Sequence, residues 1–133
     1  MIVDTSALVA IFKREPGYEL LRDAIGLEGG NLPAPALVEY MMVAGPARFA
    51  EANVLLDAFR EQGLVTQDFT AEHAAIAAEA NLRFGKSNGR GGVLNLLDLM
   101  AYAVAKDYGE PLLCTGKDFA TTDIELHAAS RPF

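Results

Sequence analysis

The stretch Ile2-Val3-Asp4-Thr5-Ser6-Ala7 decides how the rest of the chain folds. An apolar run ends at Asp4, and Thr5 or Ser6 can cap the amphipathic segment that continues to Lys13. This order predicts a short buried strand followed directly by a helix over 7–13, with Asp4 where the strand ends.

Strand and helix signals then alternate along the chain. Short apolar runs predict further strands at 31–34, 64–66 and 111–114, with an edge strand at 124–127. Helical spacing, caps and glycine or proline breaks predict helices at 18–25, 36–44, 48–62, 71–84 and 94–108. This alternation predicts an α/β fold, with a mainly parallel sheet covered by helices on both faces. Ligand sites in such sheets form outside the carboxyl ends of the strands, where Asp4 and Asp118 fall.

Length and composition bound the class of protein. The 133 residues predict a single domain, 1–133, and 51% hydrophobic with 22% charged residues is typical of a globular chain. No apolar run approaches the roughly 20 residues of a membrane span, and the start lacks the regions of a signal peptide. The single Cys114 cannot form an internal disulfide. These features predict a cytoplasmic protein with no membrane association.

The formal net charge of −7 argues against binding nucleic acid mainly through a broad basic surface. Two divalent cations held by acidic side chains would offset four of those charges, so a nucleic-acid substrate stays compatible with the composition. The same charge also suits a basic protein partner.

Three acids are each the only charged residue in a long apolar stretch. They are Asp4 within 1–12, Glu39 within 29–47 and Asp98 within 91–105. A carboxylate in a segment bound for the core loses hydration worth several kcal/mol, so it is retained only with strong donors, a cation or a function. With Asp118, which follows another apolar run, these acids form a candidate four-carboxylate metal site.

Clustered carboxylates need a cation. Two of them about 4 Å apart repel by roughly 4 kcal/mol at an effective dielectric near 20, unless they are protonated or bridged. Oxygen ligands without a His or Cys partner favour Mg²⁺ or Mn²⁺ over zinc. Such ions activate water for attack on a phosphodiester, so the acids predict a metal-dependent nuclease. The polar neighbours that can orient ligands or bound water are Thr5, Ser6, Asn95 and Thr115.

The helix predicted at 94–108 carries Asp98 at the margin of an apolar stripe, beside Asn95 and Tyr102. This placement aims the acid inward or at a cleft. The opposite side is also apolar, which predicts cover either by the chain's own domain or by a second copy in a homodimer. Helical periodicity does not separate the two. The residues of that side are Leu96, Leu99, Met100 and Ala103.

Several stretches together resemble the PIN domain, and specifically the VapC-like toxins of bacterial toxin-antitoxin pairs. They are Ile2 to Ala7, Pro33 to Glu39, Leu94 to Asp98 leading into Ala101-Tyr102-Ala103, and Pro111 to Phe119 followed by Thr122-Asp123-Ile124. Together they span nearly the whole chain.

The resemblance implies a three-layer α/β/α sandwich and an endoribonuclease that depends on Mg²⁺ or Mn²⁺. RNA would be the substrate, metal-activated water would hydrolyse its phosphodiester bonds, and a cognate VapB-like antitoxin would neutralise the enzyme. Asp4, Glu39, Asp98 and Asp118 would correspond to the catalytic and metal-binding quartet, with Asp123 as an accessory acid.

Two departures from the family pattern affect the site. Leu97 and Leu99 flank Asp98 where close relatives often have Gly and Cys, which alters the packing behind the acid and leaves the acid intact. Many relatives carry an additional acid near Gly116, and this chain does not. One metal, held chiefly by Asp4 and Asp98, is therefore favoured over two.

Two rival functions fit parts of the same pattern. Aspartyl-phosphate enzymes also place an Asp after a first strand, which makes phosphotransfer at Asp4 an alternative. Ser6 stands where such an enzyme would want a second acid. The other rival is a catalytically weak module that only binds RNA or an antitoxin.

The remaining polar residues divide into candidate RNA contacts and residues without a role. Gly85-Lys86-Ser87 is not a phosphate loop, because Ala80 replaces the required first glycine and a helix precedes it. The candidate contacts to RNA phosphates are Lys13, Arg14, Lys86 and Arg90. The residues without metal-ligand, triad or nucleophile signals are His73, His127 and Cys114.

Overall fold

The computed structural model describes residues 1–131, so positions 132 and 133 of the predicted domain lie outside the described residues. In the described part, one sheet holds the strands β1 (Ile2–Val3), β2 (Gly30–Pro33), β3 (Leu64–Gln67) and β4 (Leu112–Leu113). Their order is β3-β2-β1-β4, and every pairing is parallel. The predicted parallel α/β sheet is confirmed.

The helices fall where the sequence predicts them, with shifted ends. The α-helices of the described residues are α1 (Thr5–Phe12), α2 (Tyr18–Glu28), α3 (Ala34–Ala44), α4 (Phe49–Glu61), α5 (Ala71–Phe84) and α6 (Leu96–Tyr108). Two short 3-10 helices are η1 (Pro46–Arg48) and η2 (Asp118–Thr121). Among residues 1–131, no helix has the length and apolarity needed to cross a membrane.

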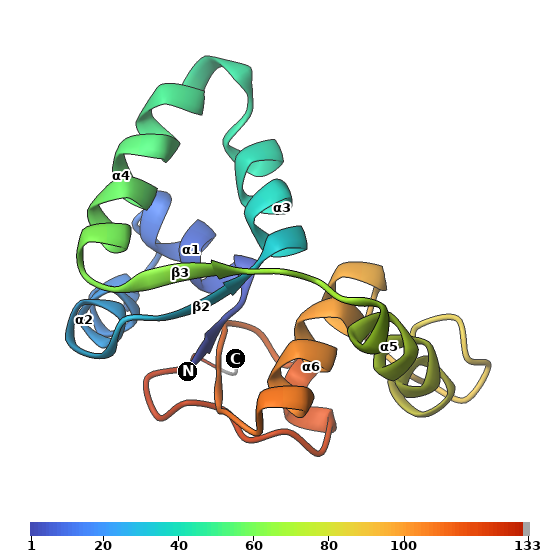
Figure 1. The fold of residues 1–133 in the computed structure, drawn as a ribbon. Helices are drawn as coiled ribbons and strands as arrows, with labels where there is room; N and C mark the ends of the chain where they lie inside the picture. Colours follow the sequence, from blue (N-terminus) through green and yellow to red (C-terminus); the bar gives the residue numbers. More distant parts are fainter. Residues whose placement is uncertain (132–133) are drawn as a thin grey trace.

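The side chains of successive residues in β1 and β4 lie on opposite faces of the sheet. Val3 and Leu113 join one hydrophobic cluster with α1, α2, α3 and α4. Ile2 and Leu112 join a second cluster with α5 and α6. The two-residue repeat of a strand explains this division, and it gives the three layers that were predicted. Figure 1 shows α3 and α4 on one side of the sheet and α6 and α5 on the other.

The starts of two helices differ from the prediction. The cap of α1 is Asp4, not Thr5 or Ser6, because its carboxylate accepts the backbone N–H of Ser6. The cap of α6 is Asn95, so that helix begins at Leu96 rather than two residues earlier. In both cases a candidate site residue fixes the start of a helix.

The predicted end of α2 at Ile25 is wrong, because the helix continues through Gly26 to Glu28. It ends where Gly29 takes φ +69° and donates its N–H to Ile25 O at 2.8 Å. A Cβ at Gly29 would lie 2.8 Å from Gly63 O, so the close approach of the two chain segments also requires glycine there.

The predicted edge strand at 124–127 lies in the right place but is reduced to a single parallel bridge between Leu112 and Leu126. Leu112 N donates to Glu125 O at 2.9 Å, and His127 N donates to Leu112 O at 2.8 Å. Segment 124–127 therefore pairs with β4 at Leu112, and a second parallel bridge joins Thr115, just after β4, to Arg131.

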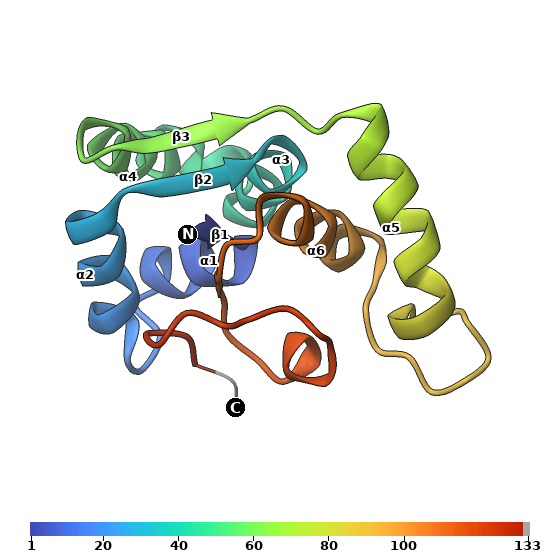
Figure 2. The same ribbon diagram turned by 60° about the horizontal axis from the view of Figure 1, so that its bottom comes forward.

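The second apolar side of α6 is covered mainly within the chain. Leu99 and Ala103 are buried in the cluster that contains Ala77 of α5, and Figure 2 shows α5 alongside α6. Leu96 stays 68% exposed. The structure therefore shows that the chain's own domain buries most of this side of α6. A homodimer contact through it stays a prediction.

The strand order reverses between β1 and β4. The chain passes from β1 to β2 and β3 in one direction and then returns to the other side of β1 to form β4. Ligand sites of open α/β sheets form at such a reversal, outside the carboxyl ends of the strands. Asp4 directly follows β1, and 115–118 follow β4, so the topology brings these segments to one crevice.

Candidate active site

Asp4 is fixed at the end of β1 by its backbone and its side chain. Its N–H donates to Leu113 O at 3.0 Å, and its Oδ2 accepts the N–H and the hydroxyl of Ser6 at 3.0 and 2.6 Å. Only 6% of the residue is exposed. Burial raises the pKa of the Asp4 carboxyl, the bonds from Ser6 lower it, and the charge of Glu39 raises it. The acid is therefore costly to ionise and firmly oriented.

The hydroxyl neighbours of Asp4 connect it to other elements. Ser6 Oγ accepts the backbone N–H of Thr115 at 3.0 Å, which joins the ends of β1 and β4. Thr5 Oγ1 donates to Ala36 O at 3.1 Å, which joins α1 to the first turn of α3. Of these predicted supporting residues, Ser6 contacts the carboxylate through its side chain, while Thr5 and Thr115 hold the surrounding backbone.

Glu39 lies on α3, shortly after β2 ends at Pro33. Pro35 occupies the first turn of the helix, where its missing N–H costs no hydrogen bond. Glu39 is half-buried, and within residues 1–131 its carboxylate has no hydrogen bond or ion pair. Its charge acts on both Asp4 and Asp98. A carboxylate in this position is available to a ligand.

Asp98 occupies the first turn of α6 in a capping box. Asn95 Oδ1 accepts the N–H of Asp98 at 2.9 Å, and Asp98 Oδ2 accepts the N–H of Asn95 at 3.1 Å. Burial raises the pKa of Asp98 most, and the Asn95 bond lowers it. The charges of Asp4, Asp118 and Glu39 also raise it, and the result is a pKa of about 6. The charges of the other three predicted acids therefore all act on Asp98.

The four acids influence one another through their charges, but their side chains do not form a complete metal-binding geometry. Among residues 1–131, no three His, Cys, Asp or Glu side chains are placed to hold a metal ion together. Asp118 is exposed at the start of η2 and acts on Asp98 through its charge. Closer approach of these side chains would need a cation to offset their repulsion.

Asp123 belongs to a different cluster. It accepts hydrogen bonds from the Tyr102 hydroxyl at 2.6 Å and from Lys106 Nζ at 2.9 Å, and Arg83 lies 3.5 Å away. The Tyr102 bond, with a smaller contribution from Lys106, outweighs burial and lowers the pKa of Asp123 to about 2. The predicted accessory acid therefore ties the C-terminal segment to α5 and α6.

The predicted RNA contacts fall in two places. Lys13 and Arg14 are exposed just after α1, and Lys86 and Arg90 are exposed in the loop between α5 and α6. None of these side chains makes an ion pair within residues 1–131. The second loop is ordered by Asn88, whose Oδ1 accepts the N–H of Arg90 at 2.7 Å.

A buried polar unit on α5 was missed by the sequence patterns. His73 is 1% exposed, its Nδ1 accepts the N–H of Thr70 at 3.1 Å, and its Nε2 lies 2.8 Å from Asp107 Oδ2. Because Nδ1 accepts, Nε2 carries the hydrogen of the neutral ring and donates to Asp107. The available signal was the spacing from Thr70 to His73, which is that of a capping box with His in place of Glu.

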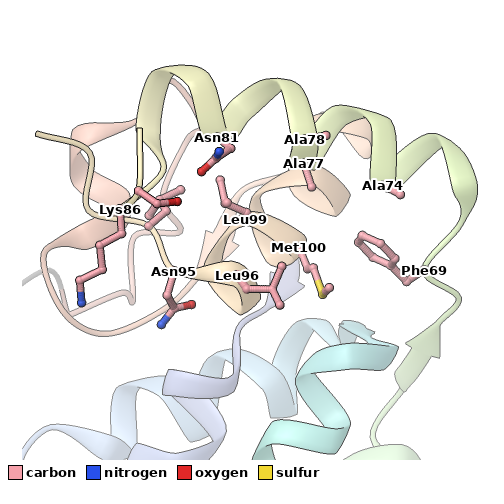
Figure 3. Close-up of a pocket in the computed structure, with 12 residues that line it drawn as sticks. Phe69, Ala74, Ala77, Ala78, Asn81, Lys86, Asn95, Leu96, Leu99 and Met100 are labelled. Atoms are coloured by element: carbon pink, nitrogen blue, oxygen red, sulfur yellow. The ribbon is translucent and has the colours of Figure 1, made fainter. Parts of the chain in front are cut away.

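No sequence pattern predicted the pocket of about 590 Å³ between α5 and α6. Asn95 and Lys86 lie at one end of it, and Phe69 and Met100 lie at the other (Figure 3). Its walls come from separate segments of the chain, so only the folded arrangement reveals it.

Comparison with known proteins gives a consistent family. Residues 1–125 match the family model described as PIN domain. Ribonuclease VapC36 of Mycobacterium tuberculosis is 40% identical over 130 residues, which cover 95% of this chain and 92% of that protein. A VapC ribonuclease of Rhizobium meliloti is 35% identical, with 92% of this chain and 97% of that protein covered.

Solved structures show the same fold at lower identity. VapBC2 of Rickettsia felis, solved with a DNA fragment from its promoter, matches with a TM-score of 0.72 and 19% identity, covering 95% and 96% of the two chains. VapC20 of Mycobacterium tuberculosis, described as a toxin that cleaves the sarcin-ricin loop, matches with a TM-score of 0.69 and 19% identity, covering 90% and 92%. These likenesses support the three-layer α/β/α architecture.

Proposed function

Because the chain belongs to the PIN domain family, and within it to the VapC-like proteins, we propose that it is a divalent-metal-dependent endoribonuclease. Its biological role in this proposal is the toxin of a toxin-antitoxin pair. Relatives named as ribonucleases match over almost the full length of both chains, which supports the assignment. RNA, which the enzyme would meet in the cytoplasm, is the substrate.

One structural observation carries the proposal. The negative charges of Asp4, Glu39 and Asp118 all act on Asp98, although the four residues are far apart in the sequence. Within residues 1–131 none of these carboxylates forms an ion pair with a cationic side chain, so the fold gains nothing in stability from their repulsion. The arrangement fits a function that needs concentrated negative charge.

The donor set fits Mg²⁺ or Mn²⁺. Each proposed ligand is a carboxylate, and hard divalent ions prefer oxygen. Asp4 and Asp98 are the principal ligands in this proposal, because hydrogen bonds from Ser6 and Asn95 already orient them. Glu39 and Asp118 complete the set and supply the remaining charge.

A bound ion would supply Lewis acidity, which lowers the pKa of water and stabilises charge on a phosphodiester. The side chains of the protein hold and orient the reacting groups. Ser6 keeps Asp4 in place, and Asn95 keeps Asp98 in the first turn of α6. Glu39 and Asp118, whose carboxylates have no protein partner in residues 1–131, could take a proton from the attacking water when they are not holding the ion.

The test is end-mapped cleavage of total RNA by the purified chain with Mg²⁺ or Mn²⁺. We expect discrete cleavage positions that disappear with EDTA and in Asp98→Asn. Covalent labelling of Asp4 by a phosphate analogue would instead support phosphotransfer. RNA or antitoxin binding by a wild-type protein that never cuts would support the binding module.

A VapB-like antitoxin is the proposed protein partner, as in the VapBC structure of similar fold. The structure offers an exposed apolar groove of about 810 Å³ between α3 and α4. Val38, Met42 and Phe49 are 59%, 74% and 54% exposed there, which is unusual for large apolar side chains. Co-expression with the product of an adjoining reading frame tests the pairing, and Met42→Glu should weaken it without affecting RNA cleavage.

The predicted homodimer is retained as a proposal without a fixed interface. The apolar side of α6 on which it was based is largely buried within the chain, apart from Leu96 and part of Met100. Sedimentation equilibrium over a range of concentrations decides whether the chain self-associates.

A further inference from the structure

We propose that the pocket between α5 and α6 receives an unstacked base of single-stranded RNA beside the cleavage centre. This inference rests on the proposed ribonuclease function and adds the place in the fold where a base outside a helix would bind. It also assigns a specificity role to residues that are not acidic.

The pocket begins next to the acid cluster. Asn95 lines it, and the Oδ1 of the same residue accepts the N–H of Asp98. At about 100° per residue, Asn95 lies between Asp98 on one side and Leu99 on the other. Figure 3 shows Leu99 pointing toward α5, with Leu96 and Met100 along the same stretch of α6. A phosphodiester held at Asp98 therefore has an adjoining nucleotide close to the pocket entrance.

The lining combines apolar walls with a few amide groups. Ala77 and Ala78 line it from α5, Leu99 lines it from α6, and the ring of Phe69 lies at one end. The side chain of Asn81 lines the pocket and has no hydrogen-bond partner within residues 1–131. A nucleobase presents apolar faces and a hydrogen-bonding edge, which this combination can accommodate.

The charge of the lining favours RNA over a basic protein segment. The chain has 18 acidic residues and a net charge of −7, yet no Asp or Glu lines this pocket. The charged side chain in the lining is Lys86, which lies at the end shared with Asn95 (Figure 3). A phosphate group of the RNA backbone at that end would meet a cation that makes no ion pair within residues 1–131. The volume of about 590 Å³ is within the usual range for small-molecule sites and large enough for a base.

A binding experiment tests the pocket without requiring catalysis. The chain contains no tryptophan, so Phe69→Trp introduces a single fluorophore at the pocket. In an Asp98→Asn background, we titrate this variant with unstructured single-stranded RNA 16-mers and with the same strands paired to their complements. We expect saturable quenching by single strands and at least about 10-fold weaker binding of duplexes, because a paired base cannot stack in the pocket.

The matched control places the same fluorophore in the groove between α3 and α4. Phe49→Trp in the same background should show little change, since Phe49 lies on α4 and does not line this pocket. Equal quenching at both positions, or equal affinity for single strands and duplexes, would overturn the inference. A concentration-dependent change in the Phe69→Trp signal without RNA would also overturn it and assign the pocket to a second copy of the chain.

A cleavage experiment then separates this inference from the proposed function. Ala78→Leu narrows the pocket, whereas Ala75→Leu makes the same change at an exposed position of α5 that does not line it. We expect Ala78→Leu to raise the KM for single-stranded RNA by about 10-fold, with a smaller effect on kcat, because it removes binding rather than chemistry. Equal rates for the two variants beside an active wild type would reject the pocket and leave the nuclease intact. An inactive wild type would reject the nuclease, and the fluorescence titration would still decide the pocket.

Discussion

Ser6 Oγ donates a hydrogen bond of 2.6 Å to Oδ2 of Asp4. The same oxygen accepts the backbone N–H of Thr115 at 3.0 Å, so one hydroxyl orients the acid and joins β1 to the segment after β4. This contact lies at the reversal of the strand order. Ser6 therefore links the topology of the sheet to the geometry of the proposed metal site.

Ser6→Ala removes both of these hydrogen bonds. We expect the free energy of unfolding to fall by about 1–2 kcal/mol, measured by urea denaturation. Metal-dependent RNA cleavage should fall by about 10-fold or more, since small displacements of a catalytic group are costly. Ser6→Thr keeps a hydroxyl and should recover most of both losses. Full activity in Ser6→Ala would show that Asp4 needs no such support.

Asp98→Asn removes one proposed ligand and keeps the capping box, because the amide oxygen can still accept the N–H of Asn95. We expect RNA cleavage to fall by more than about 100-fold, beyond the range typical of groups behind a metal ligand. Asp123→Asn is the matched control, since Asp123 pairs with Tyr102 and Lys106. It should lower stability and leave cleavage nearly unchanged. Comparable cleavage losses in the two variants would contradict the proposed division of roles.

The raised pKa of Asp98 predicts a pH effect on stability in EDTA. Its pKa is about 6 in the folded protein and 3.8 as the reference value, so the folded state binds this proton more tightly. The stability associated with the protonated group is complete below about pH 4 and is lost as pH rises through about 6. A difference of two pKa units corresponds to about 3 kcal/mol, which partial solvation reduces to about 1–2 kcal/mol.

Asp98→Asn isolates this contribution from the other titrating groups. In EDTA at pH 7.5, the variant should exceed the wild type in unfolding free energy by about 1–2 kcal/mol, and at pH 4 the two should be similar. Saturating Mg²⁺ at pH 7.5 should stabilise the wild type and have a smaller effect on the variant. Denaturation curves at the two pH values measure this. A difference that does not change with pH would exclude charge repulsion as its cause.

His73→Ala removes a buried ring that bonds Thr70 and Asp107. We expect the unfolding free energy to fall by about 3 kcal/mol, because the change leaves a cavity and an unpaired carboxylate. Cleavage per folded molecule should be preserved. The comparison variant is His127→Ala, because the His127 side chain is 16% exposed and pairs with the half-exposed Glu28, so its loss should cost less than the loss of the buried His73. A loss of catalysis without loss of stability would give His73 a role that this structure does not assign.

Much of the fold was predictable because strong local signals agreed with the tertiary contacts. The apolar run before Asp4, the proline near the start of α3 and the glycine after Tyr108 each mark a boundary that the structure confirms. The ends that moved were decided by side-chain hydrogen bonds, as with Asn95 at α6. Periodicity gives no information about which of several polar residues will cap a helix.

The sequence predicts a candidate site residue where an acid is the only charged residue in a long apolar segment. Asp4 and Asp98 meet that criterion and lie in one electrostatic neighbourhood. Asp123 does not meet it, and its ion pair with Lys106 depends on how α6 and the C-terminal segment pack. The pairing of His73 with Asp107 likewise joins two helices, and only tertiary structure places them together.

The division of the hydrophobic residues into two clusters also bears on when the proposed site is assembled during folding. Asp4 and Glu39 are attached to elements of one cluster, whereas Asp98 lies on a helix of the other. A chain in which only the first hydrophobic cluster has formed brings Asp4 and Glu39 together. It still lacks Asp98 at the site. If cleavage requires Asp98, as proposed, the newly made polypeptide cannot cut RNA until both layers have closed on the sheet.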